Sequence, residues 1–414
     1  MSLKMSQINN SELLTLNSEL PQGWRWVKLG EVCTSGGNRD PRTTPNLPFW
    51  YVDISSIDSR SKRTIEAREV LGKDAPSRAR RVIKSNDILV ATTRPNLNAV
   101  ALVPKEFNNE ICSTGFCVLR PTELTDPSFL FAFVQTKFFI ETISGQVRGM
   151  LYPAVTDNQV RNVYLPLPPL SEQRCIAGKL QELMEEVEHA RTACEKQSEA
   201  AKTLSAAYLR EVFESEESIK WERKRLGEVC EIVTGSTPKT DDPSNWNGEI
   251  FWATPNDMGK LRDFTIEDTE RKISQKGFES CSTKLLPPGS VLFTTRAPIG
   301  HLAINLKPMC TNQGFKSFIP TSKIYNWFLF FALKYFVPVL QSMGRGQTFS
   351  EISKGQVENF EIPVPHHTEQ NKIATYLKEK MEQLENLKST IRNQQSALES
   401  LPQAILRKAF RGEL

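Results

Sequence analysis

The sequence predicts a protein of the α+β class (mixed α/β). Two tandem globular domains are separated by long helices that pair as an antiparallel two-helix coiled coil with pseudo-two-fold symmetry. Three observations predict this fold. Short motifs recur along the whole chain at nearly one separation, each half carries β-branched strands beside apolar helices, and each half ends in a helix with heptad spacing.

A tandem duplication sets the domain organisation. A chain of 414 residues is long enough for two or three domains. Its repeated motifs lie 197 to 202 residues apart: LGEVC at 29–33 and 226–230, TTR at 92–94 and 294–296, Gly-Phe at 115–116 and 314–315, and LREVF at 209–213 with LRKAF at 406–410. The predicted parts are an N-terminal tail at 1–20, a first domain at 21–165, a central helical spacer at 166–218, a second domain at 219–363 and a C-terminal helical spacer at 364–414.

Each domain is predicted to combine short strands with buried helices. Strands are indicated by β-branched and apolar runs bounded by turn residues, and helices by long runs rich in aromatic residues. The predicted strands are 48–54, 87–94, 250–255 and 290–296, and the predicted helices are 127–143 and 325–340.

A proline-rich segment follows each domain. YLPLPPLSEQ at 164–173 and FEIPVPHHTEQ at 360–370 each precede a long run without proline. Proline restricts the backbone, and Ser171 or Thr368 beside a glutamate suits a helix N-terminus. We therefore expect two short, stiff segments that lead from a domain into a helix.

Heptad spacing predicts that the two long helices pack on each other. The expected seam residues are Ile176, Leu180, Leu183, Val187, Gln197 and Leu204 in the first helix, and Ile373, Leu377, Leu384, Leu387, Ile391, Gln394 and Leu398 in the second. Gln197 and Gln394 are equivalent and are expected to set the register, while Lys380 occupies one seam position. Pro402 is expected either to kink the last turns of the second helix or to restart it.

Duplication also predicts the direction of pairing. Two tandem copies related by a pseudo-two-fold axis place their helices antiparallel, with the domains at opposite ends. About 45 residues at ~1.5 Å per residue give a rod of roughly 65 Å.

Composition excludes several classes of protein. The chain is 39% hydrophobic and 24% charged, with a formal net charge of +4, and it has no uncharged apolar run long enough to span a membrane. The N-terminus lacks the apolar centre of a secretory signal, so a cytoplasmic location is expected. The eight cysteines form no C-x-x-C pair and the four histidines no cluster, which predicts buried, reduced thiols and no metal site.

Catalytic signatures are missing as well. The chain has no phosphate loop, dinucleotide fingerprint, nucleophile elbow or metal-binding histidine pair in a credible context. His366 and His367 have no histidine counterparts in the first half and are expected to face solvent. The sequence therefore predicts no catalytic residues, and a duplicated design that binds at two places.

The order of these features resembles the specificity (S) subunit of type I restriction–modification systems. The resemblance covers nearly the whole chain. It depends on the tandem halves, on LPLPPLSEQ and IPVPHHTEQ before the long helices, and on LPPGSVLFTTRAPIGHLAI followed by TNQGF in the second half, which is similar to the core of a target recognition domain.

The resemblance implies a non-catalytic, DNA-reading subunit. Each domain would read one half of a bipartite, asymmetric target in double-stranded DNA. The helices would set the spacing and dock two modification subunits that methylate adenine, and endonuclease/translocase subunits would join the complex. No cofactor is expected on this chain, whereas S-adenosylmethionine, ATP and Mg are expected on the partner subunits.

Candidate DNA-binding residues follow from this resemblance and from side-chain chemistry. Base edges are read by Arg, Lys, Asn, Gln, Ser or Thr on loops, and phosphates are held by Arg and Lys. The candidate loops are 34–41 and 234–243, which are equivalent in position and contain glycine. The candidates for reading are Asn38, Arg39, Arg94, Asn96 and Arg148 in the first domain, and Ser236, Thr237, Lys239, Arg296, Arg345 and Gln347 in the second. The basic stretch 60–84 supplies the phosphate candidates Arg78, Arg80, Arg81 and Lys84.

The two halves differ after the TTR motif. The second half continues as RAPIGHLAI, and the first half, PNLNAVALV, lacks that glycine. We therefore expect loops of different shape, as two domains that read different bases would need.

Two alternatives remain at the level of sequence. One is a self-contained DNA methyltransferase or nuclease with unrecognised motifs, and the other is a coiled-coil scaffold that links two protein-binding domains. The sequence leaves open the bases read, the spacer length, which domain reads which half-site, and whether the isolated chain binds DNA or self-associates.

Overall fold

The computed structural model describes residues 20–58, 62, 66–146, 153–261, 263–296, 298–344 and 351–414. The chain divides into two compact units, one formed by Met1–Cys194 with Asn393–Leu414 and the other by Glu195–Arg392. Each unit holds one mixed α/β domain and parts of two long helices, α6 (Leu170–Phe213) and α12 (His367–Ala409). The predicted fold class is confirmed.

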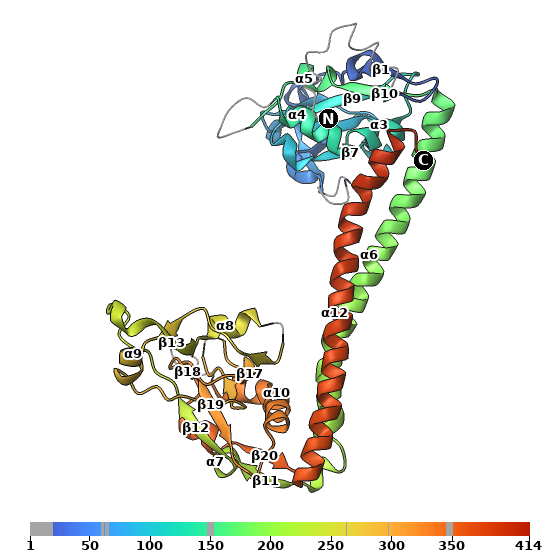
Figure 1. The fold of residues 1–414 in the computed structure, drawn as a ribbon. Coiled ribbons are helices and arrows are strands. Elements are labelled where there is room, and N and C mark those ends of the chain that lie inside the picture. Colours follow the sequence, from blue (N-terminus) through green and yellow to red (C-terminus); the bar gives the residue numbers. More distant parts are fainter. Residues whose placement is uncertain are drawn as a thin grey trace. The chain divides into compact units, whose positions relative to one another are not determined.

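The first domain contains two four-stranded sheets and one two-stranded pair (Figure 1). The sheet orders are β2-β9-β6-β7 and β4-β3-β8-β5, and β1 pairs with β10. The strands are β1 (Arg25–Lys28), β2 (Cys33–Thr34), β3 (Pro48–Val52), β4 (Arg68–Leu71), β5 (Ala79–Val82), β6 (Ile88–Ala91), β7 (Val100–Leu102), β8 (Ile111–Ser113), β9 (Phe116–Pro121) and β10 (Tyr164–Leu167). The shorter helices are α2 (Leu29–Val32), α3 (Pro127–Phe133), α4 (Lys137–Ser144) and α5 (Asp157–Arg161).

The second domain repeats this topology with small changes. Its sheets have the orders β12-β19-β16-β17-β14 and β15-β13-β18, and β11 pairs with β20. The strands are β11 (Glu222–Arg225), β12 (Cys230–Thr234), β13 (Trp246–Ala253), β14 (Thr265–Ile266), β15 (Lys272–Ile273), β16 (Val291–Phe293), β17 (Leu302–Asn305), β18 (Met309–Thr311), β19 (Lys316–Pro320) and β20 (Glu361–Val364). The shorter helices are α7 (Leu226–Val229), α8 (Pro255–Lys260), α9 (Gln275–Glu279), α10 (Asn326–Met343) and α11 (Lys354–Glu358).

One predicted helix of the first domain is two helices. The run 127–143 divides into α3 and α4 because the Thr136 side chain accepts a hydrogen bond from Phe139 N at 3.2 Å and begins a new helix. Its counterpart α10 is continuous through Pro338. Side-chain caps from Asp126 and Thr136 mark where α3 and α4 begin.

Each proline-rich segment is a strand, which the sequence did not predict. Tyr164 pairs with Lys28 and Leu167 with Arg25 in the antiparallel β1–β10 pair, and β20 pairs with β11 in the same way. Ser171 and Thr368 lie in the first turn of their helices, as expected. Helix α6 begins at Leu170, before Ser171, and α12 begins at His367, before Thr368. Each segment is therefore the last strand of its domain, and it pairs with the first strand before the helix starts.

A buried glutamine in the first helical turn holds this junction together. Gln173 Nε2 donates to Pro168 O at 2.9 Å and Leu124 O at 3.1 Å, and its Oε1 accepts from Asp126 N at 2.9 Å. The equivalent Gln370 makes the same three bonds, to Pro365 O at 2.9 Å, Lys323 O at 3.2 Å and Tyr325 N at 2.7 Å. Both glutamines are at most 1% exposed, so each links a helix root to the core of its own domain.

The two long helices pair antiparallel, as predicted. In the second unit, Ser205 of α6 lies 3.3 Å from Met381 Sδ of α12, and Glu211 accepts from Tyr376 at 3.0 Å. The residue number rises along one helix while it falls along the other. In the first unit, Cys194 Sγ lies 3.9 Å from Gln394 Oε1.

Half of the predicted seam is correct. The buried seam residues include Leu180, Val187, Leu377, Leu384 and Ile391, and Ile176 is buried too. Leu183, Leu204, Ile373 and Leu398 are partly buried and pack against these clusters.

The other predicted seam positions differ from the structure. Leu387 is 45% exposed and Gln197 is exposed, so neither lies in the seam. Gln394 is also an exposed residue, but its Oε1 accepts from the buried Cys194 Sγ of α6 at 3.9 Å. In α12 the seam position predicted for Lys380 is taken by the next residue, Met381, which is only 2% exposed. An apolar thioether suits the seam better than an ammonium group, which must keep its hydration or a partner. Lys380 Nζ instead lies 5.7 Å from the ring centres of Tyr208 and Tyr376.

Candidate nucleic-acid interface

In the first domain, backbone hydrogen bonds bring the predicted loops together. The loop 34–41 lies along β5, where Arg39 N donates to Arg80 O and Val82 N donates to Gly37 O, both at 2.8 Å. Asn38 forms an isolated β-bridge with Arg81. The neighbouring strand ends continue this surface through three further bonds of 2.8 Å: Thr114 N to Arg78 O, Thr92 N to Gly115 O, and Arg94 N to Pro153 O.

The cations of this surface fall into two groups. Arg80 lies 3.4 Å from Asp40, Arg81 is paired with Asp157, and Arg39 Nη2 donates to Asn109 O at 2.9 Å. Arg78, Lys84 and Arg94 are exposed and have no ion pair within the described part of the chain. Of the predicted phosphate contacts, Arg78 and Lys84 thus keep their charge available. Arg80 is paired with the loop 34–41, and Arg81 is paired with α5.

Arg94 and Asn96 lie on a turn with a fixed conformation. Arg94 and Asn98 have φ values of 49° and 47° and flank the short 3-10 helix Pro95–Leu97. A left-handed backbone costs an arginine on the order of 1 kcal/mol, so the surroundings must hold it there. The bond from Arg94 N to Pro153 O supplies part of that restraint, and Asn96 is exposed at the tip.

In the second domain, two buried tryptophans hold the equivalent loop. Trp252 Nε1 donates to Ser236 O at 3.0 Å, and Trp246 Nε1 donates to Lys239 O at 3.2 Å. Between these points, Thr237 Oγ1 donates to Gln313 Oε1. Ser236 and Thr237 are half-buried and Lys239 is exposed, so the loop carries reading groups on an anchored backbone.

The strand ends beside this loop are joined as in the first domain. Ser236 N donates to Thr311 O at 3.0 Å, and Thr295 N donates to Gly314 O at 2.8 Å. Arg296 follows directly and is half-buried. The structure therefore brings Thr237, Arg296 and the segment 311–315 to one edge of the domain.

The loops after the two TTR motifs differ in shape, as predicted. The first contains a 3-10 helix, whereas the second turns at Gly300, whose φ is +108°. A Cβ at Gly300 would also lie 2.6 Å from Val337 Cγ1 of α10. Only glycine fits this turn without strain.

Several site residues lie elsewhere or were missed by sequence reasoning. Arg148, Arg345 and Gln347 lie outside the described residues. Gln313 and Thr114, at equivalent places beside the Gly-Phe motifs, are exposed between the predicted loops. The shared Gly-Phe motif and the TNQGF segment are the sequence signals for this connection, but neither distinguishes the exposed Gln313 and Thr114 from their less exposed neighbours.

The described residues carry neither a metal cluster nor a membrane helix. They contain no group of three or more His, Cys, Asp or Glu side chains placed to hold a metal ion. Among their helices, none combines the length and the apolar character that a membrane crossing needs. Six of the eight cysteines are buried, and burial raises the pKa of the Cys33, Cys117 and Cys230 thiols to about 12, so these thiols stay neutral.

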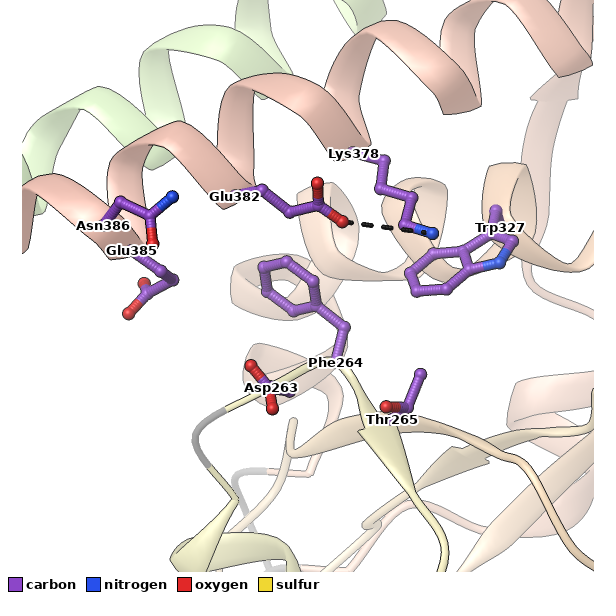
Figure 2. Close-up of a pocket in the computed structure, with 8 residues that line it drawn as sticks. All are labelled: Asp263, Phe264, Thr265, Trp327, Lys378, Glu382, Glu385 and Asn386. Atoms are coloured by element: carbon purple, nitrogen blue, oxygen red, sulfur yellow. Dashed lines mark ion pairs between the residues drawn. The ribbon is translucent and has the colours of Figure 1, made fainter.

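The second unit also has a cavity of about 410 Å³ between its domain and α12, away from the loops. Figure 2 shows its lining: Asp263, Phe264, Thr265, Trp327, Lys378, Glu382, Glu385 and Asn386. Lys378 Nζ lies 3.9 Å from Glu382 and 4.7 Å from the ring centre of Trp327. Lys378 and Glu382 are paired with each other, and Glu385 is paired with Lys388. Because these charged groups already have partners, a packing role is favoured over ligand binding.

Two tandem domains of one topology, each with a cluster of polar and cationic loops, define a class of protein with paired recognition modules on long helices. Residues 21–194 and 218–396 match the family described as type I restriction modification DNA specificity domain. The chain belongs to this family of type I restriction–modification specificity subunits.

Known relatives agree in sequence and fold. The chain is 37% identical over 170 residues to the type I restriction enzyme MjaIX specificity subunit of Methanocaldococcus jannaschii, a match that covers 41% of this chain and 39% of that protein. The putative MjaX specificity subunit of the same organism is 24% identical over 91% of this chain and 93% of its own length. The HsdS subunit of Thermoanaerobacter tengcongensis is 38% identical, with a TM-score of 0.72 over 95% of this chain and 98% of that chain. A chain from a solved type I R-M system gives a TM-score of 0.82 at the same identity, over 95% of this chain and 99% of that chain.

Proposed function

We propose that this chain is the DNA-recognition subunit of a type I restriction–modification complex and has no catalytic activity of its own. Each domain reads one half of a bipartite, asymmetric target. One observation carries the proposal: equivalent backbone bonds gather loops at the same edge of both domains, yet the exposed side chains differ, as with Thr114 and Gln313. A shared scaffold with different reading groups suits two different half-sites.

The long helices serve as spacer and docking surface. Helices of 44 and 43 residues are each about 65 Å long, or roughly two turns of B-DNA at ~34 Å per turn. Leu387 and Leu401 of α12 are 45% and 40% exposed and offer apolar positions outside the buried seam. We infer that such positions contact two modification subunits.

The chemistry is assigned to partner subunits. The modification subunits supply the S-adenosylmethionine site and methylate adenine, and endonuclease/translocase subunits supply ATP- and Mg-dependent cleavage. The complex is placed in the cytoplasm, where its DNA target lies. This chain contributes the position on DNA at which those activities act.

The test is to map methylation in vivo. The full chain is expressed with the modification subunit of its own system in a host that lacks DNA methylation, and modified adenines are mapped across the genome. A gapped motif with two specific parts is expected. A contiguous motif, or methylation without sequence preference, contradicts the proposal and favours the protein-binding scaffold. Methylation by this chain alone would instead identify a self-contained methyltransferase.

A further inference from the structure

The connection between β18 and β19 presents one glutamine from a rigid backbone. Gln313 is exposed, while both of its neighbours are held. Asn312 N donates to Ala253 O at 3.1 Å, and Asn312 Oδ1 accepts from Gly314 N at 2.9 Å. Gly314 O accepts from Thr295 N at 2.8 Å. The Gln313 side chain therefore leaves a fixed backbone and reaches the surface among the reading loops.

The amide of Gln313 is oriented as well. Its Oε1 accepts a hydrogen bond from the Thr237 hydroxyl. A carbonyl oxygen has two lone pairs, so one acceptor position is left on Oε1. Within the described residues no protein group accepts from Nε2, so the side chain offers one acceptor and one donor next to each other.

Thr237 is in turn held from both sides. Trp252 and Trp246, 3% and 9% exposed, donate their indole N–H groups to the carbonyls of Ser236 and Lys239. The guanidinium of Arg271 lies 3.6 Å from the ring centre of Trp246. The hydroxyl that orients Gln313 thus belongs to an anchored loop, and little side-chain entropy remains to be lost on binding.

An arginine lies beside this glutamine. A Cβ placed on Gly314 would be 3.5 Å from Arg296 Cγ, so the stem of Arg296 packs against that glycine. Arg296 has no ion pair within the described ranges. Glutamine bonds the N6 and N7 edge of adenine in the major groove, and arginine the O6 and N7 edge of guanine.

We propose that Gln313 reads an adenine in the half-site of the second domain through two hydrogen bonds, and that Thr237 is the positioning residue that orients its amide. This inference rests on the proposed function. The first domain has Thr114 at the corresponding place, so its half-site is read by a different side chain there.

Methylation mapping of the full complex tests this assignment. Gln313→Ala should reduce discrimination at one adenine position roughly 10- to 100-fold and leave the other half-site unchanged. Gln313→Glu should shift the preference at that position from adenine toward cytosine, because a carboxylate accepts from cytosine N4. Thr237→Val should weaken the adenine preference at the same position. Thr237→Ser should keep that preference, because serine retains the hydroxyl.

Two matched variants separate reading from general binding. Lys239→Ala, on the same loop, should lower methylation at all sites equally, and Thr114→Ala should change only the other half-site. An unchanged motif with Gln313→Ala, or a uniform loss of methylation, overturns the assignment. If the complex without substitutions produces no bipartite motif, the proposed function fails. A bipartite motif that does not change with Gln313→Ala overturns only this inference. Gln313→Glu is nearly isosteric and exposed, so it tests the assignment even if another variant does not assemble.

Discussion

The reading loops of the two domains share a framework but are anchored differently. In the first domain the loop 34–41 is held by backbone pairing with β5 and by the ion pair of Arg80 with Asp40. In the second domain the loop is held by the indole groups of Trp246 and Trp252. The comparison teaches that one topology can secure its loops by unrelated contacts, so the residues free to meet DNA differ between halves.

The largest expected effect comes from removing an aromatic anchor. Trp252→Ala deletes a side chain that is 3% exposed and stacks edge-on against Trp246 at 5.1 Å. Such truncations cost about 3–5 kcal/mol. The free energy of unfolding, measured with urea, should fall by this amount, and hydrogen exchange should rise in the second domain alone.

Trp50→Ala is the control for this prediction. Trp50 is 40% exposed in the first domain, so a change near 1 kcal/mol or less is expected. A loss for Trp50→Ala as large as that for Trp252→Ala would show that aromatic anchoring is not specific to the second domain.

The buried glutamines sharpen the comparison, because here the halves should behave alike. Gln173→Leu and Gln370→Leu each remove three hydrogen bonds and leave buried backbone groups without partners. A loss of about 2–4 kcal/mol is expected for each in urea unfolding. Gln383→Ala, at an exposed site on α12, should change little. Clearly unequal losses from the two leucine variants would contradict equivalent junctions.

Alkaline pH should destabilise the first domain more than the second. Burial raises the pKa of Cys33 and Cys117 to about 12 and that of Cys112 higher still, whereas the second domain has Cys230 at about 12 and Cys310 at about 11. A raised folded-state pKa means that the unfolded chain loses its thiol protons first, so stability falls as pH rises above about 9.

Hydrogen exchange of the full chain between pH 8 and 10 measures this difference. The steeper fall is expected in the first domain. Replacing Cys117 by serine or valine removes one titrating thiol and should flatten its slope. Equal slopes in both domains, or stability that increases with pH, would contradict the sign or the source of the effect.

The smallest effect should come from the ion pair between α5 and β5, the strand that the first loop pairs with. Arg81 and Asp157 are partly exposed, with side chains 22% and 34% accessible, so solvent screens their attraction. Arg81→Gln should cost only about 0.5–1 kcal/mol in urea unfolding. A loss above 2 kcal/mol would mean that this loop depends on charge as strongly as the other depends on tryptophan.

Much of the fold was accessible from the sequence, and the reasons are local. The duplication places LGEVC, TTR and Gly-Phe at equivalent elements of both domains, and heptad spacing predicts two long paired helices. One of the two columns of the seam, which includes Leu377, Leu384 and Ile391 of α12, was predicted correctly. The choice between Lys380 and Met381 was wrong because either gives alternating spacings of three and four along one helix.

The candidate site was predicted less completely. The loops 34–41 and 234–243 were predicted as candidates for DNA contact, but Gln313 was missed because its importance depends on Thr237, which is distant in the chain. The sequence indicates only that Gln173 lies at a helix start. Its hydrogen bonds to Leu124 and Asp126 could not be predicted, because these residues lie almost 50 positions earlier in the chain.

Periodicity, motif spacing and composition thus established two similar domains and two heptad helices, because such patterns record which residues repeat and which must leave water. The partners of single polar groups came from the folded chain alone. Whether a glutamine lies at the surface beside a threonine, as Gln313 does, or is buried among backbone groups, as Gln173 is, depends on segments that meet only after folding. Hydrogen bonds act over about 3 Å in space, whatever the separation in sequence.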